Sequence, residues 1–119
     1  MSIFIRKINE DILLYYTRTH QWVKVRELLE TGVEPVSKIK SRTYDEDPYL
    51  NLEMLPIHFA IKDNAPIDII QLLVASWPQS LNEKDGIGCK PIDFLQNDSP
   101  NFYDIHSFLR ERMNHYSIN

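Results

Sequence analysis

The sequence predicts an all-α fold, a short solenoid built from about three helix-turn-helix units. Pro56, Pro66 and Pro91 stand where helices are expected to begin, and proline loses nothing there because its missing N–H would be unpaired. Apolar residues follow these prolines at helical spacing. The pattern also recurs, with 35 residues between Pro56 and Pro91. A helix pair that recurs at such a spacing is typical of stacked repeats.

Composition sets bounds on the function. The chain has 119 residues, of which 43% are hydrophobic and 25% charged, as in an ordinary globular domain, so we expect one domain over residues 1–119. A net charge of −4 argues against nucleic-acid binding. Three glycines are too few for a Gly-rich phosphate loop.

The same composition bears on the compartment. The single cysteine, Cys89, permits no disulfide within the chain, so nothing points to an oxidising compartment. The N-terminal stretch "MSIFIRKINEDILLYY" is too interrupted by charge for a signal peptide. No apolar run approaches the roughly 20 residues of a membrane helix. We expect a soluble cytoplasmic protein without membrane insertion.

The middle unit, residues 55–83, carries the clearest helix signals. A first helix begins at Pro56 and stops near Asn64, a residue that tolerates the left-handed conformation. A second begins at Pro66 and ends before Pro78, because a proline disfavours helix in the residue before it. Its apolar stripe comprises Ile67, Ile70, Leu73 and Val74.

The two flanking units are predicted at residues 8–35 and 90–115. In the first, His20-Gln21 takes the place of the turn, and the second helix ends at Thr31-Gly32, where glycine can adopt the left-handed cap. Its Leu28-Leu29 lies 44 residues before Leu72-Leu73. In the last unit a short helix opens at Pro91, and a longer one has the apolar stripe Phe102, Ile105, Phe108, Leu109 and Met113.

Residues 36–54 are an insertion between the first two units, predicted as an extended β-hairpin or long finger. On one arm Lys38, Lys40 and Arg42 alternate and share a face. That basic face either holds a phosphate or an acidic partner, or serves only for solvation and edge protection. The tip contains an acidic triplet without the ligand spacing of a calcium loop and two tyrosines, which favour a contact surface: Tyr44, Asp45, Glu46, Asp47 and Tyr49.

One segment resembles a known family. "LPIHFAIKDNAPIDIIQLLVASWPQSLNEKDGIGCKPIDFL" is similar to the ankyrin repeat, with its Thr-Pro-Leu-His start, short turn and Asp-x-x-Gly-x-Thr-Pro-Leu hairpin. "THQWVKVRELLETG" resembles the second helix of an N-terminal repeat. Leu55 replaces the usual threonine and Asp93 the second histidine. The resemblance implies an ankyrin-type solenoid with β-hairpin connections.

The residues suited to chemistry have structural roles under this resemblance. His58 is implied to pack between units and to bond neighbouring hairpins; a general base or a metal ligand would need partners that the sequence does not supply. Cys89 would need a nearby cation such as Lys90 to become reactive, and no histidine–acid pair can be assigned to it. We therefore expect no catalysis, metal, cofactor or small-molecule substrate.

The resemblance implies a protein–protein interaction module, an adaptor or inhibitor that binds a protein partner through hairpin tips and a concave face. The alternative is a structural accessory subunit built permanently into a larger assembly, which the apolar Ile3, Phe4 and Ile5 favour. Besides the tip of the insertion, the expected contact residues are Met54, Lys62, Asp63, Gly86, Ile87, Cys89 and Asn97.

Overall fold

The computed structural model describes residues 3–38 and 53–116, and these are mostly helical. Their elements are α1 (Ile3–Arg18), α2 (Trp22–Glu30), α3 (Pro56–Lys62), α4 (Ile67–Ser76), the 3₁₀ helices η1 (Pro78–Asn82) and η2 (Pro91–Phe94), and α5 (Phe102–Tyr116). No strand occurs in these two ranges, and the only bridge residue there is Met54. The predicted all-α class is therefore confirmed.

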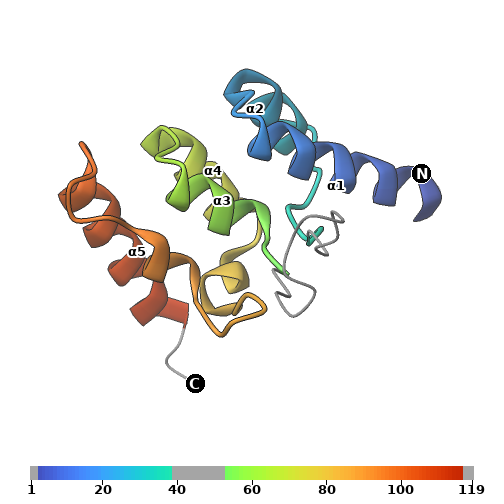
Figure 1. The fold of residues 1–119 in the computed structure, drawn as a ribbon. Helices are drawn as coiled ribbons and strands as arrows, with labels where there is room; N and C mark the ends of the chain where they lie inside the picture. Colours follow the sequence, from blue (N-terminus) through green and yellow to red (C-terminus); the bar gives the residue numbers. More distant parts are fainter. Residues whose placement is uncertain (1–2, 39–52, 117–119) are drawn as a thin grey trace, which may run out of the picture.

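The helices form layers that lie side by side. In Figure 1, α1 and α2 stand at one end, α3 and α4 in the middle, and α5 at the other end. Contacts join α1 to α2 and α3 to α4 within layers, and α1 to α3 and α2 to α4 between layers. The row of α1, α3 and η2 is called the inner row below, and α2, α4 and α5 form the outer row.

The first two layers, α1–α2 and α3–α4, have the same helix-turn-helix geometry. His20 and Asn64 both adopt left-handed backbone angles, with φ of 61° and 58°, and they lie 44 residues apart. The next residue in each turn donates its N–H to a carbonyl five residues back, with N–O distances of 2.9 Å in both turns. The 44-residue offset seen in the leucine pairs therefore also holds for the backbone geometry of the turns.

Proline explains where the inner helices begin. Pro56 and Pro91 occupy the first turns of α3 and η2. The residue before each proline donates its backbone N–H to a side chain three positions further along the chain. Leu55 N–H donates to His58 Nδ1 at 3.1 Å, and Lys90 N–H donates to Asp93 Oδ2 at 2.8 Å. Asp93 thus performs in the third unit the capping role that histidine has in the second.

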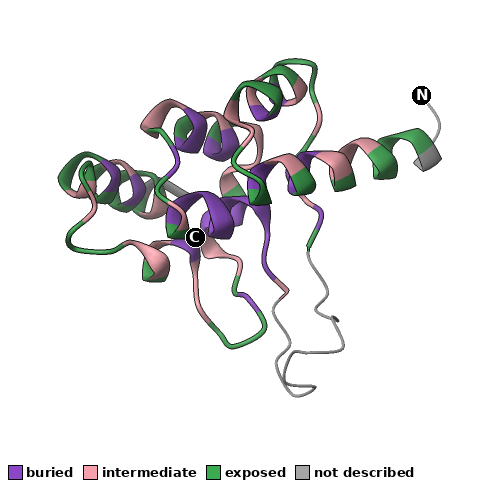
Figure 2. Cartoon of the chain, turned by 45° about the horizontal axis from the view of Figure 1, so that its top comes forward, coloured by how far each residue is buried: buried purple, intermediate pink, exposed green. Residues whose placement is uncertain are grey.

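One buried core runs through all the layers. Its apolar side chains come from both rows, and no single helix pair could bury them alone. Figure 2 shows buried residues on helices of each row. A second, smaller cluster on the inner row joins Leu14, Met54 and Phe59, with Phe94 packed against it. Among the residues that the structure describes, the largest fully buried apolar side chains include Leu13, Leu55, Ile57, Ile61, Ile69, Ile70, Leu73, Leu81, Ile105 and Leu109.

The predicted β-hairpin connection is the part of the fold that needs correction. Between η1 and η2 the chain makes a tight turn closed by Asp85 N–H donating to the Cys89 carbonyl at 2.8 Å. The Asp85 carboxylate accepts the N–H groups of Ile87 and Cys89, at 3.0 and 2.8 Å. Gly88 supplies a φ of 91°. Because the carboxylate takes these donors, no strand pairing forms in this segment.

Candidate functional site

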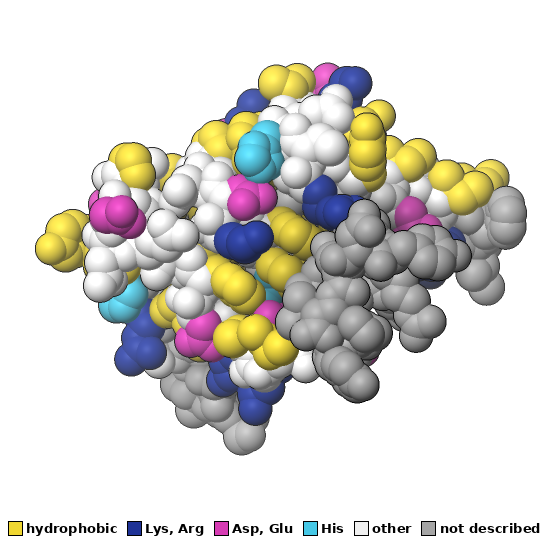
Figure 3. Space-filling view, viewed as in Figure 1, with side chains coloured by type: hydrophobic (Ala, Val, Ile, Leu, Met, Phe, Trp, Pro, Cys, Tyr) yellow, Lys and Arg dark blue, Asp and Glu magenta, His cyan; other side chains and the backbone are white. Residues whose placement is uncertain are grey.

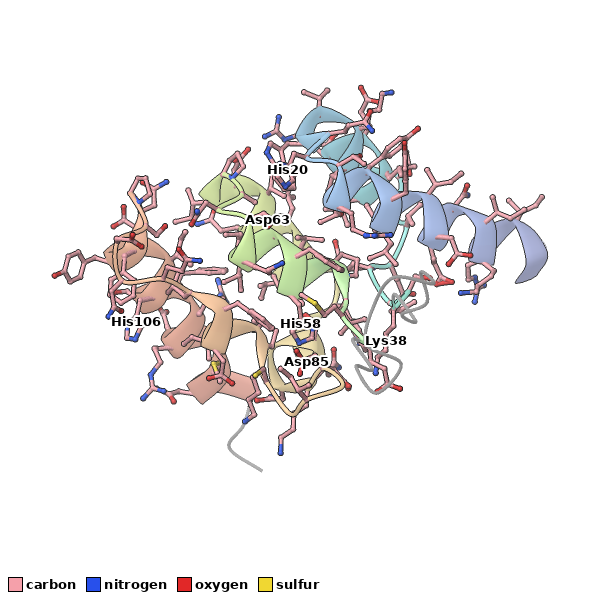
Figure 4. All side chains as sticks on the ribbon, in the orientation of Figure 1. His20, Lys38, His58, Asp63, Asp85 and His106 are labelled. Carbon is pink, nitrogen blue, oxygen red and sulfur yellow. The ribbon has the colours of Figure 1, made fainter. Side chains whose placement is uncertain are left out.

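His58 is the buried histidine of the inner row, and both of its ring nitrogens are used. Nδ1 accepts the Leu55 N–H at 3.1 Å, so in this tautomer Nε2 carries the hydrogen and donates it to the Glu83 carbonyl at 3.1 Å. The Phe94 ring packs edge-on against the imidazole, with 5.9 Å between the ring centroids. His58 therefore ties α3 to the segment after η1, the role that the resemblance implied (Figure 4).

The surroundings of His58 keep it neutral. Burial lowers its pKa below the ordinary value, and this outweighs the Glu83 carbonyl and the Asp85 carboxylate, which favour the charged form. A fully buried side chain (0% exposed) with both nitrogens bonded to backbone has no position from which to take a proton from a substrate. His58 is thus a structural residue.

Cys89 lies in the turn between η1 and η2 and is half-buried. Partial burial and the carboxylates of Asp85 and Asp93 raise the pKa of its thiol. A raised pKa disfavours the thiolate, which is the nucleophilic form of cysteine. The adjacent Lys90 therefore does not activate it.

An unexpected contact links the first two turns. The His20 imidazole lies 3.0 Å from Asp63 Oδ2, and its ring stacks on Trp22 with centroids 5.3 Å apart. The two residues approach because the turns of equivalent units lie next to each other in the stack (Figure 4). The sequence carries no motif for this pair, since 43 positions separate its members. Asp63, an expected contact residue, is thus already engaged within the chain.

The inner row carries a strip of aromatic and basic side chains. We call Tyr15, Arg18, Phe59, Lys62, Lys90 and Phe94 the inner-face strip. The Arg18 guanidinium lies 5.7 Å from the centre of the Phe59 ring, and Lys62 is one turn beyond Phe59 on the same side of α3. Figure 3 shows Lys and Arg side chains beside hydrophobic ones over α3. Sequence reasoning found Lys62 but missed Arg18.

The other expected contact residues have different positions. Gly86 and Ile87 are exposed at the turn, and Ile87 keeps 64% of its surface. Asn97 is exposed after η2. Met54 is only 4% exposed and packs beneath the strip with Leu14 and Phe59, so it supports the surface from below. The predictions for Tyr44, Asp45, Glu46, Asp47 and Tyr49 lie outside the described residues.

A hollow lies on the outer row of helices. It has a volume of about 650 Å³ and lies between α2, α4 and the middle of α5, and its only acid, Asp68, forms an ion pair with Arg26. The Arg112 guanidinium lies 5.5 Å from the Phe108 ring centre. The lining includes no histidine, cysteine or serine: Arg26, Asp68, Gln71, Leu72, Val74, Ala75, Pro78, Phe108 and Arg112.

Within residues 3–38 and 53–116, no three His, Cys, Asp or Glu side chains gather closely enough to hold a metal ion. No helix in the same ranges has the length and hydrophobicity needed to cross a bilayer. Comparison of the chain with protein-family models, with curated proteins and with solved structures finds no match.

Proposed function

We propose that this chain is a non-catalytic, ankyrin-type protein–protein interaction module of the cytoplasm. The partner binds on the inner row of helices and on the turn between η1 and η2. The 44-residue repeat of the helix pair, the shared capping of α3 and η2 and the brace at His58 support this assignment. Stacked repeats of this kind present a continuous surface along one face, and that surface is their usual means of binding.

One observation carries the proposal. The polar groups that sequence reasoning considered for chemistry are used inside the fold: His58 bonds two backbone groups, and the pKa of Cys89 is raised. What the inner side offers to solvent is an apolar tip at Ile87 and a strip of aromatic and basic side chains. Such a surface serves contact, since tyrosine, phenylalanine and arginine are enriched in protein interfaces.

One isoleucine and one valine, equally exposed but on different sides of the molecule, provide the test. Ile87 at the inner turn and Val23 on the outer helix α2 are both 64% exposed. In a pull-down from cell extract with the tagged chain, Ile87→Glu is expected to remove the partner, because a charge in an apolar contact is desolvated without compensation. Val23→Glu is expected to leave the recovered partner unchanged. Loss with Val23→Glu and retention with Ile87→Glu would contradict the proposed surface.

The insertion is tested in the same experiment. A third sample replaces residues 39–52 with a glycine-serine linker, which removes the tyrosine and acidic residues expected to contact the partner. A weaker recovery than with the intact chain supports a contribution of the insertion. Equal recovery shows that the described inner face is sufficient. Circular dichroism of each variant confirms that the helices are retained.

Exposed apolar side chains on α1 favour the alternative, a structural accessory subunit. Ile5, Ile8 and Tyr15 of α1 are 49%, 44% and 57% exposed, and three large apolar side chains on one helix are a common mark of an obligate interface. Size-exclusion chromatography of the chain used in the pull-down distinguishes the two functions. A monomer supports the adaptor, and aggregation that a partner reverses supports the subunit.

A further inference from the structure

We propose that a second copy of this chain docks on the outer side of α1, with the two α1 helices antiparallel about a two-fold axis. The contact surface is the end stripe, defined here as Ile8, Ile12 and Tyr15. It lies at the free end of the stack, next to the inner-face strip, with which it shares Tyr15. The contact is therefore additional to the one proposed for the inner row.

The end stripe lies on the side of α1 that faces away from the core. Its members are spaced by four and three positions, which places them on one side of a helix. Leu13 and Thr17, both 0% exposed, lie on the opposite side, because a helix turns about 100° per residue. Ile8 and Tyr15 remain 44% and 57% exposed, and Ile12 is half-buried. This end of the stack thus presents an apolar stripe to solvent.

The first half of α1 has little support from its neighbours. Residues 5–8 are exposed at four consecutive positions, so solvent reaches every side of the helix there. Figure 2 shows this part of α1 projecting from the other helices. A short helix without packing partners is marginal in water. A second helix laid along the end stripe would stabilise this segment.

The opposite end of the stack has a different character. Terminal units need a polar outer face, and α5 has one where α1 does not. Contact of α1 with α5 of another copy would bury its polar groups without partners. The end stripe is therefore matched best by another end stripe, and contact of a surface with itself closes a two-fold dimer. Apart from Tyr103, the exposed residues of α5 are polar and include Asp104, His106, Ser107, Arg110 and Glu111.

The positions along the stripe define how two α1 helices fit together. In the seven-residue pattern of paired helices, Ile8 and Tyr15 are equivalent and Ile12 takes the second apolar position. In an antiparallel pair, Ile12 then packs against Tyr15 of the second copy, and Tyr15 against its Ile12. The weakly supported first half of each helix lies along the second half of the other, which the stack holds in place.

Charge complementarity favours this antiparallel register. It brings Asp11 beside Arg18 of the second copy, and the two-fold axis repeats the pair. Both residues are exposed. The Asp11 side chain, 54% exposed, keeps its ion pair with Lys7 and has room for a second cation. A parallel pair would instead place Asp11 beside the uncharged Tyr16 of the second copy.

Size-exclusion chromatography with light scattering, run on the full chain alone, tests the dimer. The mass is expected to rise from 14.1 kDa to twice that value as the concentration approaches about 500 µM, since one helix pair is a small interface. Tyr15→Glu is expected to raise the dissociation constant by about tenfold or more, because a charge replaces an apolar contact twice per dimer. Tyr103→Glu, at a residue 82% exposed on α5, should change it by less than about twofold.

A second pair of variants tests the register. Arg18 and Lys24 each lie over an aromatic ring, at 5.7 and 5.1 Å from its centre, so both substitutions lose a similar contact within the chain. Arg18→Glu places two acids side by side in the dimer and is expected to weaken it by about tenfold. Lys24→Glu on α2 should have less than about a twofold effect.

The outcomes separate the dimer from the proposed function, because no partner is present in this measurement. A monomer at every concentration, equal losses in Tyr15→Glu and Tyr103→Glu, or aggregates that only a foreign partner reverses would overturn the dimer. Equal effects of Arg18→Glu and Lys24→Glu would overturn the antiparallel register. If circular dichroism shows that Tyr15→Glu does not fold, Ile8→Glu replaces it, with Val23→Glu as its control. A dimer that dissociates on dilution agrees with an adaptor.

Discussion

Replacement of His58 by alanine is expected to lower the free energy of unfolding by about 3 kcal/mol. The substitution leaves the Leu55 N–H and the Glu83 carbonyl without the partners that the imidazole provides, at a position that is 0% exposed. Each buried polar group left unpaired costs about 1–3 kcal/mol. Urea unfolding followed by circular dichroism at neutral pH measures the loss.

The control is His106→Ala on α5. His106 is exposed, so its removal is expected to change the free energy of unfolding by less than about 0.5 kcal/mol. An equal, small effect of both substitutions would show that His58 does not brace the inner row.

The same variant removes a pH dependence. Burial lowers the pKa of folded His58, whereas in the unfolded chain it titrates near its ordinary value of about 6.5. The unfolded state therefore binds the proton first as the pH falls, and the free energy of unfolding of the wild-type chain should decrease below about pH 6.5. In His58→Ala this decrease should be smaller, which would assign the difference to His58.

Leu73→Ala is the second substitution with a large expected effect. Leu73 is 0% exposed and belongs to the main core on α4, the helix that stands in the middle of the outer row. Loss of its side chain removes buried apolar surface and leaves a cavity, for a destabilisation of about 3 kcal/mol in urea unfolding.

Its neighbour is the matched control. Leu72 is half-buried and borders the hollow of the outer row, so Leu72→Ala makes the same chemical change with less burial to lose. The expected loss is less than half of that at Leu73. A larger loss at Leu72 would contradict the assignment of the core.

The helices were predictable because their signals are local. Pro56 and Pro91 begin inner helices as expected, and Pro66 stands directly before α4. Of the apolar stripe predicted for α4, Ile70, Leu73 and Val74 are buried in the core, and Ile67 packs against it half-buried. Such signals depend on the backbone geometry of a few consecutive residues, which the residue types determine almost alone.

The contacts of the surface were less predictable because they join distant positions. The pair of His20 with Asp63 and the approach of Arg18 to Phe59 depend on how adjacent layers align, and no single unit contains them. The β-hairpin expected around Asp85 was wrong because one carboxylate satisfies the turn instead. Met54 was expected at the surface but fills the small cluster beneath it.

The claim that this fold acts through contact on its inner row is tested most directly by NMR. Backbone amide shifts of the labelled chain are followed as the partner recovered in the pull-down is added. We predict that the largest changes fall on the inner-face strip, at Tyr15, Arg18, Phe59, Lys62, Lys90 and Phe94. Changes concentrated instead on α2, α4 and α5, around the hollow of the outer row, would contradict the claim.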